Sequence, residues 1–429
     1  MLHAMKKDPH LKVGFSMKRI TPPVGTMLAG YSTRKDPSVG VHDDLFSRVL
    51  FLEYDGEVVI LVSLDLLGVT REFHRDVARL VKEKIDLSSE NIVIASTHTH
   101  AGPDLYGVYS RYNPKLLEET ERKVADSIVA SSHNPHEING IITATGNCVH
   151  IIVNRRNPKS GPIDPRIHVL SLTSEKERYS ILNFTCHGVV LGHNNLYISA
   201  DYPGSYVRKY EAYTHSKALF FNGACGNINP LTPGTNLDKV YDRSVGTFKD
   251  VDWMGEILAR ESVKIIKRAG EEEIKDFSFK TKIIKLSIQD IPPIQELEDE
   301  LDKVQKDISK NDSPEARFKL FKARKALQLA KSLQGKKYIE ASTSALRIND
   351  KAIVFLPSEV FVEIQMKIKE QSPYSFTMVI GYANGYFGYI PTTEAYDEGG
   401  YETIFPVTLL KRGEGERLAD EVLKLIDKI

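Results

Sequence analysis

Residues 91–102 constrain this chain more than any other stretch. They open with a short apolar, β-branched run at 92–95, which is typical of a buried strand. Polar residues follow at once, and His98 and His100 are among them. In an extended chain, side chains at positions i and i+2 point to the same face. We therefore expect both imidazoles to face one cavity at the strand end, with the neighbouring threonines on the other side.

Two imidazoles at a strand end offer half of a metal site, because neutral histidine is a common zinc ligand. The alternative interpretation is that one or both histidines are ordinary polar residues at a strand terminus. The choice depends on whether the rest of the chain supplies further ligands.

The residues before this stretch predict its setting. Two apolar runs, 48–54 and 57–64, flank Asp55-Gly56, which is a strong β-hairpin signal. A helix is expected from Thr70, a good N-cap, with apolar residues at helical spacing as far as Ile85, and the strand that begins at Ile92 follows it. Strand, helix and strand favour a parallel pair, and ligands bind beyond the carboxyl ends of such strands.

The remaining pattern predicts an α/β fold built on a mixed sheet. Residues 13–40 are rich in Gly and Pro and are expected to be a loop-rich segment with little regular structure. Further helices are expected at 116–131, 205–215, 252–267, 361–369 and 413–429, and further strands at 141–145, 148–153, 167–172, 179–185, 218–221, 352–356 and 376–382. We find no internal repeat in the sequence.

Residues 292–337 differ in composition from their surroundings. Apolar residues recur every three or four positions from Ile294 to Ile308, and a second helix is expected from Ser313-Pro314. This pattern predicts an inserted antiparallel helical hairpin. We interpret it as a structural arm, or as a contact through which the chain forms a homo-oligomer, and assign it no chemistry.

Composition excludes several classes of partner. The 429 residues carry 57 Lys+Arg and 57 Asp+Glu, so the net charge gives no reason to expect nucleic acid or anionic membrane as a main partner. No apolar run is long enough to span a bilayer. The polar start at Met1 lacks the apolar core of a signal peptide, and three cysteines are too few for a disulfide framework. We expect a cytoplasmic protein.

Four polar residues follow apolar strand patterns in different parts of the chain. They are His98, His187, Glu359 and Tyr389. Each one alone has an ordinary structural interpretation. Because strand ends of one sheet share one rim, their common placement favours a shared site.

The sequence also resembles a known family. Thr97-His98-Thr99-His100-Ala101-Gly102-Pro103 is similar to the Thr-His-Thr-His-Ser-Gly-Pro signature of the neutral/alkaline non-lysosomal ceramidase family. Other blocks follow in the family's order: Gly30-Tyr31, His42-Asp43, Asn154-Arg155, Phe184 to His187, Asn194-Asn195, Pro357-Ser358-Glu359, Asn384 to Tyr389, and Tyr401-Glu402. The blocks are short, so the specificity lies in their number and order.

The resemblance implies a site and a chemistry. One zinc ion per chain would be held by His98, His187, Glu359 and Tyr389. His100 and Arg155 would contact the substrate or support the ligands, and Tyr401 would face the scissile group. It also implies one catalytic domain over residues 1–429, with the 292–337 hairpin inserted, that ends where the family's catalytic domain ends and lacks the immunoglobulin-like domain of longer members.

One block departs from the family. Where the family has Gly-Asp-Val-Ser-Pro, this chain has Gly226-Asn227-Ile228-Asn229-Pro230, so Asn229 replaces a serine. Asn cannot act as a hydroxyl nucleophile, which favours a zinc-activated water over a serine acyl-enzyme. Cys225 is the one neighbouring alternative nucleophile. The change leaves ceramide itself open as the substrate.

We therefore expect a zinc-dependent hydrolase of an N-acyl amide bond, acting on a small or lipid-like substrate. Asn229 is expected to form a wall of the pocket. Two alternatives stay open. One is a zinc esterase or lactonase that uses the same site. The other is a zinc-containing binding protein that has lost turnover, an interpretation that Asn229 favours.

Overall fold

The computed structural model describes residues 10–429. Residues 1–9, on which the expectation of no signal peptide rests, lie outside the described residues. Among the residues described, each helix is too short or too polar to cross a membrane.

The same succession of elements occurs three times along the chain. Three strands pair antiparallel, a helix follows, a fourth strand returns parallel to the third, and a second helix completes the unit. The first unit is β1 (Leu11–Arg19), β3 (Phe46–Tyr54), β4 (Glu57–Leu64), α1 (Arg71–Lys82), β5 (Ile92–Ser96) and α2 (Pro114–Ser131).

The second unit is β7 (Gly140–Asn147), β9 (Arg166–Thr173), β10 (Arg178–Phe184), α3 (Asp201–Thr214), β12 (Lys217–Asn222) and α4 (Phe248–Ile266). The third is β15 (Phe277–Ser287), β16 (Tyr338–Ile348), β17 (Lys351–Phe355), α7 (Val362–Gln371), β19 (Phe376–Ile380) and α9 (Glu414–Ile426). Side chains differ between the units, which is why no repeat is visible in the sequence.

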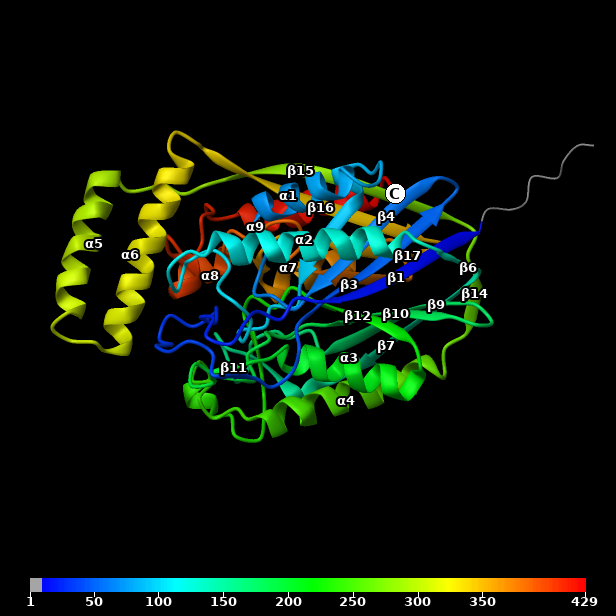
Figure 1. Cartoon of the computed structure of the whole chain (residues 1–429), viewed down its shortest axis with the longest axis horizontal. Coiled ribbons are helices and arrows are strands. Elements are labelled where there is room, and N and C mark those ends of the chain that lie inside the picture. Colours follow the sequence, from blue (N-terminus) through cyan, green and yellow to red (C-terminus); the bar gives the residue numbers. More distant parts are fainter. Residues whose placement is uncertain (1–9) are drawn as a thin grey trace, which may run out of the picture.

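The three sheets enclose one central core. Strand side chains alternate between two faces, so Leu50 and Leu52 of β3 enter the central core, where they meet Leu219 of β12 and Ile353 of β17. The alternate faces are covered by helix pairs: α1 and α2 on the first sheet, α3 and α4 on the second, α7 and α9 on the third. Figure 1 shows α3 and α4 on the opposite side of the strands from α1, α2 and α9.

Several short elements complete the chain. Strand β6 (His136–Ile138) extends the first sheet beside β1, and β14 (Glu271–Glu273) extends the second beside β7. Two-residue and three-residue strands form three further pairs: β2 (Gly40–Val41) with β11 (Tyr197–Ile198), β8 (Ile152–Asn154) with β13 (Ile228–Pro230), and β18 (Glu359–Val360) with β20 (Tyr389–Ile390). Helix α8 (Thr393–Glu398) and a 3₁₀ turn at Tyr401–Thr403 lie between β20 and α9.

The expected start of the fold is confirmed. Asp55 and Gly56 both have positive φ, at 48° and 85°, which is the conformation of a two-residue hairpin turn. The Thr70 side chain accepts a hydrogen bond from the Phe73 amide and caps α1. Strands β4 and β5 pair in parallel as expected.

Two expectations about regular structure were wrong. Residues 13–40 were expected to have little of it, but they begin inside β1, an internal strand between β3 and β6. Residues 148–153 were expected to be one strand, but Val149–Ile151 is a 3₁₀ turn and only Ile152–Asn154 is extended.

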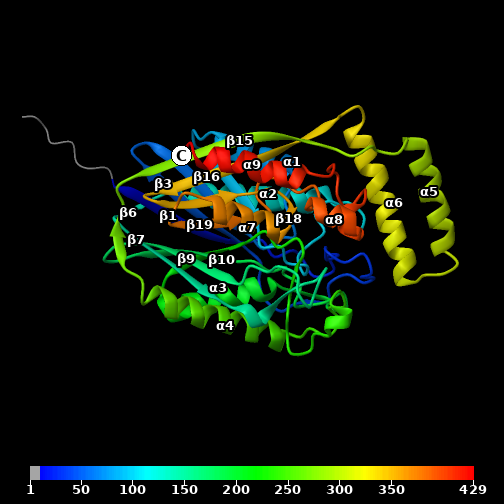
Figure 2. The same ribbon diagram turned by 180° about the vertical axis from the view of Figure 1, so that it is seen from behind.

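The inserted hairpin consists of α5 (Ile294–Ile308) and α6 (Pro314–Leu333). Both views show α6 next to the body of the molecule and α5 outside it (Figures 1 and 2). Leu297 of α5 packs against Ala326 and Ala330 of α6, so part of the apolar stripe of α5 is buried within the chain itself. That the hairpin is an insertion into one domain, and that it pairs two chains, stay predictions.

Candidate functional site

The parallel strand pairs of the three units all deliver side chains to one site. His98 and His100 follow β5 of the first unit, and His187 follows β10 of the second. Glu359 follows β17 of the third unit. The rule that ligands collect at the carboxyl ends of parallel strands thus applies to three sheets at once.

His98 reaches the site through an unusual backbone. Its φ is 63°, so the chain is left-handed rather than extended there, contrary to our expectation. Its amide donates to the Leu66 carbonyl, and its Nδ1 lies 2.6 Å from the Leu67 carbonyl oxygen. These bonds hold the strained conformation and leave Nε2 of His98 at 3.2 Å from Nε2 of His100. The two imidazoles do converge, but not through strand alternation.

His187 and Glu359 meet beside the His98 ring. Nδ1 of His187 lies 2.6 Å from the Cys225 carbonyl oxygen. Its Nε2 lies 3.0 Å from Oε2 of Glu359, and the same oxygen is 3.4 Å from Nε2 of His98. Oε1 of Glu359 accepts a hydrogen bond from the Tyr386 hydroxyl at 2.5 Å.

The donor set has the form of a cation site. A carbonyl oxygen has no proton, so Nδ1 of His98 and Nδ1 of His187 must each carry one, and both Nε2 atoms then present lone pairs. Burial, and then the charge of Arg155, lower the pKa of His187 to about 4, so its ring is neutral. Two lone pairs and a carboxylate oxygen therefore converge, and a metal ion satisfies all three.

His100 completes a group of three histidines able to hold a metal. Its ligand atom and those of His98 and His187 all lie within 4.8 Å of one another. Nδ1 of His100 is buried and has no hydrogen-bond partner among residues 10–429. Gly30, at φ 95°, crosses the His100 ring so closely that any Cβ there would collide with it. The Gly30-Tyr31 block thus shapes the position of His100.

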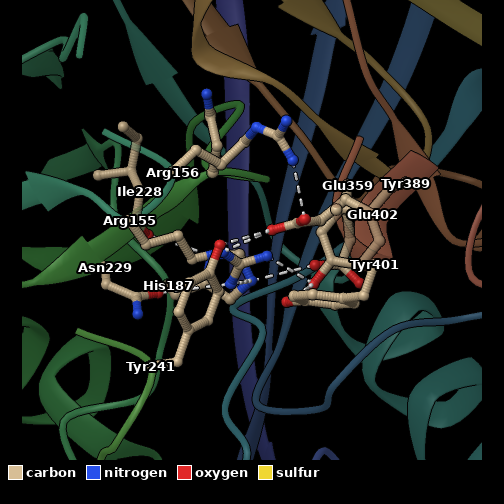
Figure 3. A network of polar contacts seen from close by, with 12 residues as sticks. Arg155, Arg156, His187, Ile228, Asn229, Tyr241, Glu359, Tyr389, Tyr401 and Glu402 are labelled. Atoms are coloured by element: carbon tan, nitrogen blue, oxygen red, sulfur yellow. Dashed lines mark hydrogen bonds and ion pairs between the residues drawn. The ribbon is translucent and has the colours of Figure 1, made fainter. Parts of the chain in front are cut away.

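Arg155 is the centre of the polar network in Figure 3. Its Nη2 donates to the Tyr389 hydroxyl at 2.9 Å, and Nη1 lies 3.4 Å from Oδ1 of Asn229 and 3.4 Å from Nε2 of His187. Its Nε pairs with Oε1 of Glu402 at 3.2 Å. The guanidinium therefore faces the metal site from one side and is neutralised from the other.

Tyr389 and Tyr401 lie beside this arginine. The hydroxyls of Tyr389 and Tyr401 are 3.4 Å apart, and both rings lie under the Arg155 guanidinium. Among the described residues, the Tyr389 hydroxyl contacts Arg155 and Tyr401 rather than the histidines. Its role as a metal ligand stays a prediction.

The residues of the 226–230 block, which differs from the family signature, and the neighbouring Cys225 have different surroundings. Asn229 lines the site and donates from Nδ2 to the Val240 carbonyl. Asn227 points away, accepting from the Val362 amide and donating to Glu363. Cys225 is fully buried, its Sγ is 3.0 Å from the Tyr382 hydroxyl, and burial raises its pKa. A thiol in that state is a poor nucleophile.

The candidate site opens into a cavity of about 410 Å³. All the expected site residues contribute to its walls except His98, which lies beneath them. Sequence reasoning missed two residues here: Tyr386, which lines the cavity, and Glu402, which pairs with Arg155 but does not line the cavity. Tyr386 lies within the Asn384–Tyr389 block, and Glu402 directly follows Tyr401, so their blocks were visible but their contacts were not.

Helix α6 of the hairpin forms part of this cavity. Phe318, Phe321 and Lys325 line it together with His100, Arg155 and Glu359. The hairpin was assigned no chemistry from the sequence, and its place on the cavity wall was not anticipated. Periodicity predicted the two helices, but it contains no information about the surface on which they pack.

Fold and site together define an α/β protein of mixed sheets with a histidine–carboxylate cluster able to hold a metal ion. The chain belongs to the neutral/alkaline non-lysosomal ceramidase family: the sequence model described as "Neutral/alkaline non-lysosomal ceramidase, N-terminal" matches residues 11–235.

Individual relatives agree with this assignment. The chain is 27% identical to the neutral ceramidase of Pseudomonas aeruginosa over 251 residues, which is 52% of this chain and 37% of that protein. It is 24% identical to the neutral ceramidase of Oryza sativa over 267 residues, 57% of this chain and 34% of that protein. The matches thus span only about a third of the length of these relatives.

A solved structure extends the likeness in fold to nearly the whole chain. The crystal structure of neutral ceramidase from Pseudomonas aeruginosa superposes with a TM-score of 0.75 at 20% identity. The superposition covers 98% of this chain and 74% of the other. The expected α/β fold class is thereby confirmed.

Proposed function

We propose that this protein is a zinc-dependent hydrolase of an N-acyl amide bond. The observation that carries the proposal is that two unprotonated imidazole nitrogens, Nε2 of His98 and Nε2 of His187, converge on one carboxylate oxygen of Glu359. Membership of a family named for ceramidases supports an amide as the bond that is cleaved.

His98, His187 and Glu359 would hold the zinc, with Tyr389 as the fourth ligand. The donors suit zinc, which binds histidine and carboxylate ligands and keeps an open position in catalytic sites. When bound, zinc would lower the pKa of a water to about 7 and polarise a carbonyl.

The chain's own residues would then do three things. Arg155 and Tyr401 would donate to the carbonyl oxygen as negative charge develops on it, because both line the cavity beside the ligands. His100, neutral and next to His98, would accept the proton that the attacking water loses. Asn229 would hold the Arg155 guanidinium in place through Oδ1.

A direct assay tests the proposal. Chain loaded with zinc is expected to release fatty acid from at least one member of a panel of N-acyl amides, ceramide included. His187→Ala, given the same zinc, should release none, and His150→Ala, at an exposed histidine outside the site, should behave like the parent. Turnover of esters alone would favour the esterase alternative. No turnover of either class by zinc-loaded chain would favour the binding protein.

A further inference from the structure

Helix α6 is anchored to the body of the protein at the site cavity. The Phe321 ring stacks on the Tyr109 ring, with centroids 5.3 Å apart and planes 12° from parallel. One turn further along the helix, the Lys325 ammonium lies 5.9 Å from the Phe321 ring centroid. Phe321 and Lys325 both line the cavity that contains His100, Arg155 and Glu359.

Lys325 is a cation without a carboxylate partner. No carboxylate oxygen lies within ion-pair distance of its ammonium in the part of the chain that the structure describes, and the ammonium faces the Phe321 ring instead. Burial lowers its pKa to about 8. Lysine in an apolar setting is costly unless something compensates the charge, and the attraction of Glu359 offsets the burial of Lys325 only in part, so this ammonium at a cavity wall points to a ligand.

A second cation in the same cavity is also incompletely satisfied. Arg243 is 2% exposed, its Nε donates to the Val189 carbonyl, and its Nη2 has no partner among residues 10–429. Arg155 does not add to this surplus, because Glu402 neutralises it. Among the residues described, Glu359 is the one carboxylate on the cavity wall, and it faces the histidines.

The surroundings extend the positive charge outward. A neighbouring groove of about 390 Å³ shares Phe321 and Tyr109 with the site cavity. Four cationic side chains and a single carboxylate line it: Arg34, Lys35, Arg317, Arg324 and Asp312. A cleft lined by one sign of charge concentrates ligands of the opposite sign at its mouth.

An apolar cavity of about 160 Å³ adjoins the site cavity and shares Phe321 with it. It is lined by Leu66, Leu105, Leu329 and Phe387, and Lys325 lies on the wall that it shares with the site cavity. Lys325 is thus positioned where an apolar pocket meets the polar cavity that holds the reacting groups.

We propose that Lys325 determines substrate specificity by binding an anionic group next to the scissile amide, so that the substrate is an N-acylated acid rather than a neutral N-acyl alcohol. The acyl chain occupies the apolar cavity, and the Arg243 Nη2 is the second donor to the anion. This rests on the proposed function. Hydrolysis adds one water across the C–N bond and releases a fatty acid and an amine that bears the acidic group.

Three acyl compounds of equal chain length separate the possibilities. N-lauroylglycine carries a carboxylate, N-lauroyl-O-phosphoethanolamine carries a phosphate, and N-lauroylethanolamine is neutral. At pH 7 we expect kcat/KM for at least one of the two anionic compounds to exceed that for the neutral compound by about 10-fold or more. The preferred anion identifies the acidic group.

Variants of α6 assign the preference. Lys325→Met should reduce the ratio of anionic to neutral kcat/KM by about 10–100-fold, the range for a lost hydrogen bond to a charged group, and Lys325→Arg should keep most of it. Lys319→Met is the matched control, because Lys319 is exposed on the same helix and should leave the ratio unchanged.

Equilibrium dialysis of zinc-loaded chain makes the same comparison without turnover. If the chain hydrolyses nothing but binds N-lauroylglycine in preference to the ethanolamide through Lys325, the anion site stands and the proposed hydrolase fails. A ratio near one in the parent, or a ratio that Lys325→Met does not change, overturns the anion site whether or not the amides are hydrolysed.

Discussion

Glu359 and Tyr389 are register partners in the short parallel pair of β18 and β20. Adjacent strands lie about 4.8 Å apart, so a carboxylate and a phenol enter the site side by side. The phenol oxygen also accepts a hydrogen bond from Arg155 at 2.9 Å. Burial raises the pKa of the Tyr389 phenol well above its ordinary value, and the neighbouring Arg155 cation opposes that shift.

Tyr389→Phe is therefore expected to weaken zinc binding by about 10–100-fold, while the three other ligands retain some affinity. Competition with a chromogenic chelator measures the affinity. Tyr241→Phe is the matched control, since Tyr241 lines the same cavity but its hydroxyl contacts Glu402 rather than a proposed ligand. Equal affinities for both variants and a reduced activity of Tyr389→Phe alone would mean that Tyr389 acts on the substrate through Arg155.

Protein purified without added metal is expected to carry about one zinc ion per chain. His98→Ala should lose it, because His98 contributes one of the two bare Nε2 atoms that face Glu359. Elemental analysis after gel filtration gives the stoichiometry, with His150→Ala as the control at an exposed histidine. A zinc-free parent protein, or full occupancy in the doubly substituted His98→Ala, His187→Ala chain, is incompatible with this site.

His100→Ala should keep the metal and lose activity. Nε2 of His100 is 3.2 Å from Nε2 of His98 rather than directed at Glu359, which suits a proton acceptor beside the ligands. Metal content and kcat, measured on one preparation, separate the two roles. Loss of zinc from His100→Ala would instead make the three-histidine group the true ligand set.

Much of this architecture was predictable because local signals agreed with the fold. Asp55-Gly56 adopts the turn that its type favours, and Thr70 caps the helix that its position predicts. Strand β1 was missed although Leu11, Val13, Phe15 and Met17 alternate, because the Gly-rich and Pro-rich residues after it dominated the interpretation.

The failures at the site have a common cause, which is contact between distant segments. His98 adopts a left-handed backbone because carbonyls of the loop after β4 hold it there. Phe321 meets Tyr109 only when the hairpin folds back on the body. Sequence periodicity reports which face of an element is apolar, but not which surface covers it.

Tyr401→Phe should lower kcat by about 10²-fold or more with little change in KM, because its hydroxyl would act on charge that forms only in the transition state.

Cys225→Ala should keep zinc and measurable hydrolysis, since the thiol is fully buried against Tyr382. Steady-state kinetics on the best substrate of the panel gives both values. An acyl adduct on Cys225 detected by mass spectrometry, together with an inactive Cys225→Ala, would replace the water mechanism by a covalent one.

Replacing residues 292–337 by a short Gly/Ser linker should leave the zinc content unchanged, because none of the proposed ligands lies on α5 or α6. It should nevertheless raise KM strongly, since Phe318, Phe321 and Lys325 leave the cavity wall. Phe321→Ala is the milder form of the same test, and it should raise KM most for long-chain substrates. Unchanged KM in a folded deletion protein would show that the hairpin is only an arm, and a change in sedimentation would show that it joins two chains.

Lys325 should make the protein less stable than a variant without its charge. Burial lowers the pKa of its ammonium from the ordinary 10.5 to about 8, so the folded state opposes protonation. Below pH 8 the folded chain contains the unfavourable charge, and as the pH rises from about 8 to about 10.5 this penalty disappears, because the folded state has already lost the proton. Lys325→Met should therefore be more stable than the parent by on the order of 1–2 kcal/mol at pH 7, and the difference should shrink towards pH 10.

Urea unfolding of the two proteins at pH 7 and at pH 9.5, without substrate, measures this difference in the free energy of unfolding. The contributions of all other titrating groups cancel, because both proteins contain them. The preference for an anionic substrate should decline over the same range, as pH rises through about 8 and the Lys325 ammonium loses its proton. A lysine with a purely structural role would make Lys325→Met less stable at pH 7 and leave the pH profile of the anionic-to-neutral ratio flat. Higher stability together with lost discrimination is the signature of a charge retained for binding, because the cost in folding is recovered only when the anion is bound.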